Sequence, residues 1–312
     1  IFVNFFILSI YFLLKFLKKQ KRNDLIYLSF TLAITALIRP QIYYIYIVIL
    51  FIIIFLLNNT TREKIRFFLI FIIIFKSCLS IWEYRNYKIH NNYFFVIAKE
   101  ANLIGYYLPH FDQYQYQINL DEAKKTRSIK WKNYLNNQKE INLNSNDLIL
   151  KEKLAIKYTL NELKNYDVFN FLIANIMGSV KTVFLPSYID IGYFFKLKKI
   201  SFSSTEGVNF FEQGVNFILL IYKNNLSYFI FLVLSLFLIF LTRLIQIYGF
   251  IIMFKNKPKI SIMALMIILF YLILLGPVGA PKYRIPFEIF FSLYLSYGVL
   301  SLQKLFKKKI NN

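Results

Sequence analysis

Seven apolar runs, separated by short basic clusters, constrain this chain more than any other feature of its sequence. The runs cover residues 1–14, 25–38, 41–57, 65–81, 226–244, 260–275 and 285–302. With 57% hydrophobic and 20% aromatic residues, the chain carries more apolar surface than a soluble core of its 312 residues could bury. Because hydrocarbon offers no hydrogen-bond partners to the backbone, such segments cross a bilayer as helices. We therefore predict an all-α polytopic membrane protein with about seven transmembrane helices.

The fourth run ends abruptly at Trp82, where aromatic, charged and amide side chains begin. Aromatic rings with a polar edge settle at headgroup depth, so we interpret Trp82, Tyr84 and Tyr87 as the membrane interface. Arg85 and Asn86 are then expected just outside it. This interpretation divides the chain into four spans in 1–81, an outer region in 82–225 and three spans in 226–312.

The distribution of Lys and Arg predicts the orientation of the spans. Five of these residues lie in 15–22, three in 62–66, three in 255–259 and four in 304–309. Lys and Arg near helix ends are retained on the cytoplasmic side, whereas long domains cross largely regardless of charge. We therefore predict a multi-pass protein of the cytoplasmic (inner) membrane, with a cytoplasmic C-terminus and a periplasmic outer region. The net charge of +22 comes with no nucleic-acid-binding motif, so no nucleic-acid partner is expected.

The outer region is predicted to be mostly helical. Apolar side chains recur at helical spacing between residues 148 and 163, after a Ser-Asn-Asp sequence that can cap a helix. A second apolar segment, 169–184, is stopped by Pro186. We interpret it as a helix on the membrane surface, and a further span of about 16 residues is the alternative.

Few residues point to a particular reaction. His90 and His110 have no Cys or HExxH partner, so a zinc site is not expected and both are interpreted as surface histidines. The sequence also contains no nucleotide-binding or serine-hydrolase motif. Several carboxylates could act as a base, but spacing selects none and most are interpreted as solvated: Glu83, Glu100, Asp112, Asp121 and Glu122.

Two outer turns carry arginine beside proline. Arg39 and Pro40 join two runs that are short for a bilayer, so this turn is expected below the outer surface. A guanidinium there could bind phosphate oxygens bidentately or extend to ordinary lipid headgroups, and both interpretations stay open. The last outer loop places Tyr283 and Arg284 between prolines, either toward a headgroup phosphate or as a turn with interfacial anchors.

Four motifs occur in order along the chain. They are Leu37-Ile38-Arg39-Pro40, Trp82-Glu83-Tyr84-Arg85-Asn86-Tyr87, Asn102-Leu103 and Lys282-Tyr283-Arg284-Ile285-Pro286. In these motifs the chain resembles bacterial membrane glycosyltransferases of the GT-C class, which are related to the dolichyl-phosphate-mannose protein mannosyltransferases. That family shows an LxRP turn, a WxxRNY exit from the membrane, an NL segment and an RYRxP element before the last span. Lys282 stands where the family often has arginine.

The resemblance implies inverting transfer of a sugar from a polyprenyl-phosphate donor to a lipid, glycan or protein acceptor of the cell envelope. It implies donor-phosphate contacts by Arg39, Arg85 and Arg284, with Asn86 and Tyr283 shaping the site among membrane lipids. No cofactor follows from the residues, and the resemblance leaves a divalent metal ion open. The implied catalytic acid lies in an outer loop that we expect upstream of Ile1, since the chain does not begin with methionine. Without that acid, the chain is expected to be inactive by itself.

Two other classes of membrane protein fit the same charges. A transporter or flippase more often has ionisable residues at mid-span, whereas Lys76 and Arg243 are expected near span ends. An O-antigen polymerase or ligase also handles polyprenyl-linked glycans with outer-loop arginines, but usually has more spans. A glycosyltransferase is therefore the preferred prediction.

Overall fold

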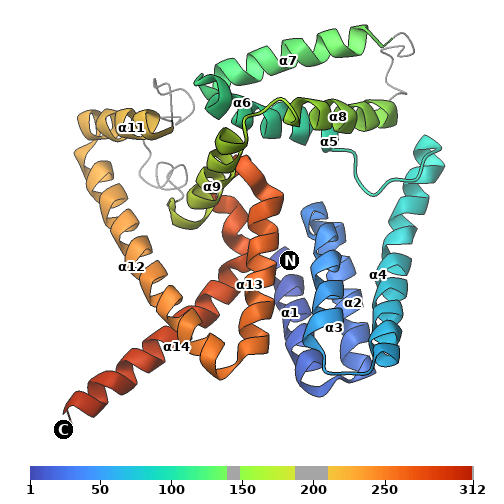
Figure 1. Ribbon diagram of the computed structural model, residues 1–312, viewed down its shortest axis with the longest axis vertical. Helices are drawn as coiled ribbons and strands as arrows, with labels where there is room; N and C mark the ends of the chain where they lie inside the picture. Colours follow the sequence, from blue (N-terminus) through green and yellow to red (C-terminus); the bar gives the residue numbers. More distant parts are fainter. Residues whose placement is uncertain (139–147, 187–209, 311–312) are drawn as a thin grey trace. The chain divides into compact units, whose positions relative to one another are not determined.

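Every element in the described part of the chain is a helix. The computed structural model describes residues 1–138, 148–186 and 210–310 (Figure 1). The first elements are α1 (Phe2–Lys19), α2 (Arg22–Ile38), η1 (Pro40–Tyr44), α3 (Ile45–Leu56) and α4 (Thr61–His90). The middle elements are α5 (Lys99–Asn102), η2 (Leu103–Tyr107), α6 (Leu108–Tyr116), α7 (Leu120–Asn136), α8 (Leu148–Leu163) and α9 (Val168–Phe184). The last are α11 (Phe210–Asn224), α12 (Leu226–Asn256), α13 (Pro258–Leu275), η5 (Gly276–Val278), η6 (Pro281–Arg284) and α14 (Ile285–Ile310).

Among the described residues, four helical segments are long and apolar enough to cross a membrane, by length and composition. They are Thr61–His90, Leu226–Asn256, Pro258–Val278 and Pro281–Lys307. The first three apolar runs form shorter helices, with 18 residues in α1, 17 in α2 and 12 in α3. At 1.5 Å per residue, α3 alone spans about 18 Å of the roughly 30 Å of hydrocarbon. An all-helical membrane protein is thus supported, and the number of seven spans stays a prediction.

The chain folds into two compact units. Unit 1 comprises Ile1–Val96, Leu244–Tyr271 and Ile285–Asn312, and unit 2 comprises Ile97–Arg243 and Leu272–Arg284. The predicted division into 1–81, 82–225 and 226–312 stays a prediction.

Packing in the N-terminal part of unit 1 centres on α2, which contacts both α1 and α4. Phe16 of α1 is fully buried and meets the ring of Phe67 on α4 edge to face, with centroids 5.2 Å apart. Ser9 Oγ of α1 donates a hydrogen bond to Thr31 Oγ1 of α2 at 3.1 Å. A hydrogen bond between helices fixes their register where the surroundings are apolar.

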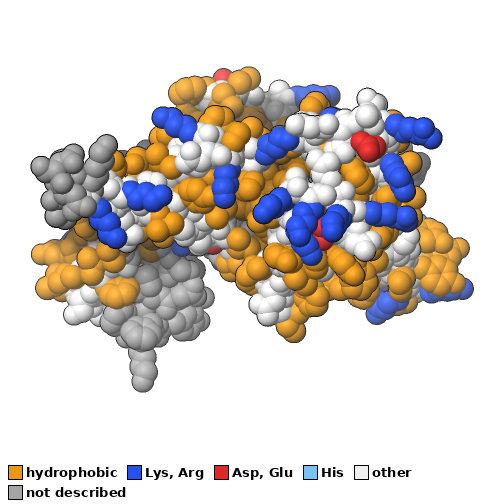
Figure 2. Space-filling model, turned by 90° about the horizontal axis from the view of Figure 1, so that it is seen from below, with side chains coloured by type: hydrophobic (Ala, Val, Ile, Leu, Met, Phe, Trp, Pro, Cys, Tyr) orange, Lys and Arg blue, Asp and Glu red, His pale blue; other side chains and the backbone are white. Residues whose placement is uncertain are grey.

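The basic connections of unit 1 share one end. Figure 1 shows the links from α1 to α2, from α3 to α4 and from α12 to α13 at the lower end, and the link through η1 at the upper end. These three lower links carry the basic clusters 15–22, 62–66 and 255–259. Figure 2 views the molecule from this side and shows Lys and Arg side chains among hydrophobic ones, with few acidic side chains. This arrangement agrees with the charge pattern expected of one membrane face, although the identity of that face stays a prediction.

α4 does not end at the predicted membrane exit. The helix begins with a capping box, in which Thr60 Oγ1 accepts from the Glu63 backbone and Glu63 accepts from Thr60 N–H. It then continues through Trp82 and ends at His90, before Asn91 takes a left-handed conformation with φ 52°. Aromatic and charged residues mark a change of solvent, but they do not stop a helix, whereas a left-handed cap does.

Two glycines let α12 and α14 approach closely within unit 1. A Cβ atom on Gly249 would lie 1.8 Å from the carbonyl oxygen of Tyr294. One on Gly298 would lie 2.4 Å from the carbonyl oxygen of Ile245. Small residues at such crossings allow backbone contact in membrane helices, because van der Waals packing replaces the hydrophobic effect there.

Unit 2 is built around short helices that share one apolar cluster. The cluster consists of residues from η2, α6, α7 and α8: Ile104, Leu108, Trp131, Leu135, Ala155 and Tyr158. The carboxylate of Glu152 on α8 accepts from the backbone N–H groups of Lys99 and Glu100, at 2.8 and 2.9 Å, which satisfies the start of α5. The predicted helices 148–163 and 169–184 are confirmed as α8 and α9. The position of α9 on a membrane surface stays a prediction.

The helix crossing at Gly249 can be tested by adding one methyl group. We expect Gly249→Ala to destabilise the protein by about 1–3 kcal/mol, because the new Cβ overlaps backbone that cannot rotate away. The measurement is the thermal unfolding midpoint in detergent. Gly214→Ala on α11 is the control, since nothing lies within 4 Å of its Cβ position. Equal midpoints for the two variants would contradict the close crossing.

Candidate functional site

The WxxRN motif lies on the last turns of α4 in unit 1. Trp82 and Asn86 are four residues apart and therefore share one face of the helix. Trp82 Nε1 donates to the carbonyl oxygen of Phe95 at 3.1 Å, and Asn86 Nδ2 donates to that of Phe94 at 2.9 Å. These bonds hold the chain that follows α4 against the helix, and they account for the spacing of the two residues.

Arg85 is presented on the outside of this arrangement. Its guanidinium stacks on the Trp82 ring at 4.7 Å, and its Nη1 donates to Asn86 Oδ1 at 3.4 Å. Asn86 is buried and Arg85 is exposed. The ring and the amide therefore orient a guanidinium whose remaining donors face outward.

Arg39 owes its position to the proline that follows it. A residue before proline is disfavoured in the helical region, and Arg39 has φ −136° and ψ 96°, which ends α2 at Ile38. The guanidinium lies over the Phe2 ring at 5.1 Å, and its Nε donates to Gln41 Oε1 at 3.3 Å. Within the described ranges, neither Arg39 nor Arg85 forms an ion pair with a carboxylate.

Lys76 occupies the middle of α4 and contacts Tyr43 of η1 and Tyr46 of α3. Its ammonium donates to the Tyr43 hydroxyl and lies over the Tyr43 and Tyr46 rings, at 4.6 and 5.9 Å. Arg243 likewise lies near the middle of α12. Because α4 and α12 extend beyond the apolar runs 65–81 and 226–244, the middle of each helix need not be the middle of a span, and the position of both residues near span ends stays a prediction.

Tyr283 and Arg284 belong to unit 2, where the last outer loop packs against α9. Gly178 of α9 touches this loop so closely that a Cβ on it would lie 2.0 Å from the carbonyl oxygen of Gly276. Arg284 Nη1 donates to the carbonyl oxygens of Val183 and Leu185 at 3.3 and 3.2 Å, and Arg243 Nε donates to Val183 at 3.1 Å. Two guanidiniums thus satisfy carbonyls at the end of α9, where the helix dipole favours cations. Contact of Arg284 with a lipid phosphate stays a prediction.

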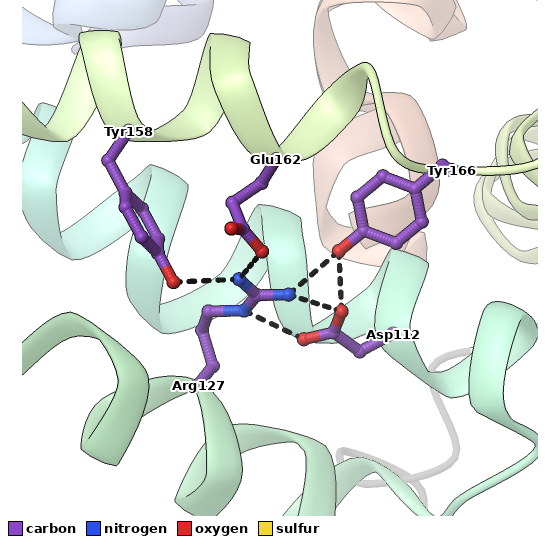
Figure 3. A network of polar contacts seen from close by, with 5 residues as sticks. All are labelled: Asp112, Arg127, Tyr158, Glu162 and Tyr166. Carbon is purple, nitrogen blue, oxygen red and sulfur yellow. Dashed lines mark hydrogen bonds and ion pairs between the residues drawn. The ribbon is translucent and has the colours of Figure 1, made fainter. Parts of the chain in front are cut away.

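A buried polar network of unit 2 surrounds Arg127 of α7 (Figure 3). Arg127 has no exposed surface, and its Nε and Nη2 bind both oxygens of Asp112, with 2.8 Å between Nε and Oδ2. Its Nη1 donates to Glu162 and to the Tyr158 hydroxyl, the latter at 2.9 Å. Tyr166 completes the network by accepting from Nη2 and donating to Asp112.

This network holds charges rather than exposing them. Burial by itself lowers the pKa of the Arg127 guanidinium, but the hydrogen bond and charge of Asp112 outweigh burial and raise it. Burial, together with the charge of Asp112, raises the pKa of the Tyr166 hydroxyl. The interpretation of Asp112 as a solvated candidate base is therefore wrong. A carboxylate held bidentately by a buried guanidinium ties α6, α7 and α8 together instead.

His110 of α6 is also buried, which corrects its interpretation as a surface histidine, whereas His90 is exposed. Its Nδ1 lies 2.7 Å from the carbonyl oxygen of Tyr106, so the neutral ring donates this hydrogen bond. Burial lowers the pKa of His110 to about 4, and the charge of Lys181 acts in the same direction. The ring is therefore neutral near pH 7.

In the part of the chain that the structure describes, no three His, Cys, Asp or Glu side chains come together in a way that could hold a metal ion.

The chain matches no protein-family model, and it matches no curated protein and no solved structure. The resemblance to GT-C glycosyltransferases therefore rests on the four sequence motifs and stays a prediction.

Removing the central guanidinium tests the network of Figure 3. We expect Arg127→Met to destabilise unit 2 by about 3–5 kcal/mol, because Asp112 is then left buried without its partner. Hydrogen exchange of α6, α7 and α8 is the measurement. Lys125→Met removes the same charge from an exposed position of α7 and serves as the control. The network would not be a main stabilising element if both variants exchanged alike.

The buried histidine predicts a pH dependence. The folded pKa of His110 is about 4 and the unfolded pKa is near 6.5, so the unfolded state binds more protons between these values. Stability should therefore fall as the pH drops from about 6.5 to about 4, by on the order of 3 kcal/mol. Unfolding of His110→Gln should lose this dependence, and His90→Gln should keep it. A parallel pH profile for all three proteins would contradict the assignment.

Proposed function

We propose that this protein is a membrane glycosyltransferase that moves a sugar from a polyprenyl-phosphate donor to a lipid, glycan or protein acceptor. The observation that carries the proposal is the arrangement of Arg39 and Arg85 in unit 1. Each guanidinium is stacked on an aromatic ring and steadied by an amide side chain, and neither is paired with a carboxylate in the described residues. Both belong to motifs of the family that the chain resembles.

The position of these arginines suits a lipid phosphate. They lie at the η1 turn and on the C-terminal turns of α4, at the end of unit 1 opposite the basic connections (Figure 1). If the basic connections are cytoplasmic, the arginines lie at the outer face of the membrane and the C-terminus lies inside. A planar guanidinium offers paired donors to phosphate oxygens, and an aromatic face does not compete for those donors.

The proposed reaction uses these cations to stabilise the leaving group. The bond between the anomeric carbon and the phosphate oxygen breaks, and its electron pair stays on the polyprenyl phosphate. The acceptor oxygen forms the new glycosidic bond and gives its proton to a base. Arg39 and Arg85 would stabilise the charge that grows on the phosphate, which is where donors lower a barrier most. Arg284 and Tyr283 are further candidates from the family motif, and no residue described here is assigned as the base.

Loss of either arginine should weaken donor binding. We expect Arg85→Ala and Arg39→Ala each to reduce affinity for polyprenyl phosphate by roughly 10- to 100-fold, since hydrogen bonds to a charged group contribute about 1.5–3 kcal/mol. Trp82 fluorescence reports binding, because the indole lies directly beneath Arg85. Arg62→Ala, an exposed arginine of α4 at the opposite end, is the control. Unchanged affinity in both variants would count against the proposal.

A transporter or flippase for lipid-linked glycans is the second candidate, and Lys76 favours it. An ionisable residue within a candidate span, bonded to a tyrosine of a neighbouring element, is typical of a transport pathway. Reconstituted vesicles separate the two functions. A transferase releases polyprenyl phosphate from the donor in the presence of an acceptor membrane, whereas a flippase moves the intact donor between leaflets. An O-antigen polymerase or ligase would require a glycan acceptor in the same assay.

A further inference from the structure

A partly open, apolar cavity of about 230 Å³ lies between three helices of unit 1. The Ser296 hydroxyl on its wall donates to the carbonyl oxygen of Ser292 at 2.9 Å, so its proton already has an acceptor. Apolar cavities do not retain water well, and one of about 150 Å³ can bind a small hydrocarbon. The cavity is therefore suited to hydrocarbon rather than to water. Its walls come from α1, α13 and α14 and include Ile10, Leu14, Met263, Phe290, Ser292 and Ser296.

Two exposed lysines lie on the helices that form these walls, toward the end of unit 1 that carries the basic connections. Lys18 follows Leu14 of α1 by four residues, and Lys259 precedes Met263 of α13 by four residues. Residues four apart share one face of a helix, and they are separated by about 6 Å along its axis. Each lysine is therefore about one turn away from the cavity, on the face that lines it.

A third lysine contacts the α14 wall directly. The ammonium of Lys257 lies over the ring of Tyr297, the residue that follows Ser296, with 5.7 Å to the ring centroid. Within the described ranges, none of the three lysines forms an ion pair with a carboxylate, because the buried Asp24 at this end is paired with Lys15. The cavity is thus apolar and has three positive charges beside one end.

We propose that this cavity binds one acyl chain of an anionic membrane phospholipid, whose phosphate lies against Lys18, Lys257 and Lys259. The chain matches the apolar walls, and basic pockets between membrane helices bind anionic headgroups. Arg39 and Arg85 lie at the opposite end of unit 1, so this site is separate from the one proposed for the sugar donor (Figure 1). The inference therefore does not depend on the proposed function.

The chain-binding part of the site is tested on the full protein, freed of lipid in detergent. Ser296→Leu places a larger side chain in the cavity. Ser235→Leu is the matched control on α12, because both serines donate to the carbonyl oxygen four residues earlier. Native mass spectrometry measures bound phosphatidylglycerol and phosphatidylcholine. We expect Ser296→Leu to weaken binding of both lipids roughly tenfold or more, since each CH₂ group left unburied lowers affinity about fourfold, and Ser235→Leu to bind normally.

The charged part of the site is tested with the same two lipids. We expect Lys18→Gln and Lys259→Gln each to weaken binding of phosphatidylglycerol roughly fivefold, because each removes one positive charge next to its phosphate. Binding of phosphatidylcholine, which has no net charge, should change little. Arg66→Gln is the control, since it removes an exposed charge of α4 from the same end of unit 1.

Three results would overturn the site. Phosphatidylglycerol that binds Ser296→Leu as tightly as the unchanged protein would exclude the cavity. Equal losses in Lys259→Gln and Arg66→Gln would show a diffuse effect of charge. Displacement of phosphatidylglycerol by polyprenyl phosphate at a lower concentration would assign the cavity to the sugar donor instead. Donor binding by Arg39→Ala and Arg85→Ala is measured separately, so the failure of this site and the failure of the proposed function are distinguishable.

Discussion

The absence of water as a hydrogen-bond partner is the constraint on which the proposed membrane-spanning part of the structure depends. Backbone groups in hydrocarbon must be satisfied within the chain, which the helices of the described residues achieve. Hydroxyl side chains follow the same rule, since Ser29 and Thr35 donate to carbonyl oxygens four residues earlier. Cations are accommodated on aromatic rings and neutral oxygens, as Lys76 is by Tyr43 and Tyr46.

In unit 2, buried polar side chains are satisfied by ion pairs instead. Arg127 is fully buried, yet its donors meet two carboxylates and two tyrosines. Such a network gives little net stability relative to an apolar core, but it strongly opposes any arrangement in which one partner is missing. Two of the carboxylates considered as candidate bases have structural partners, because Asp112 binds Arg127 and Glu100 accepts a hydrogen bond from Trp131.

Periodicity and charge predicted the helices, but not their ends or their partners. The runs 65–81 and 226–244 correspond to α4 and α12, whose ends extend beyond them because polar residues continue a helix until a cap stops it. The burial of Arg127 could not be predicted, since its partners are 15 to 39 residues away along the chain. Burial of His110 was missed for the same reason. The five predicted site residues were chosen by motif, and the contacts of Arg39 with Phe2 and of Arg284 with Val183 join segments that no local pattern brings together.

The structure shows which contacts the residues of two motifs make. In WxxRN, Trp82 and Asn86 bind the backbone that follows α4, whereas the arginine between them is exposed. In LxRP, Pro40 forces Arg39 out of the helix and creates the turn that carries it. Both motifs therefore support a guanidinium through local contacts, and Arg39 also lies over the ring of the distant Phe2.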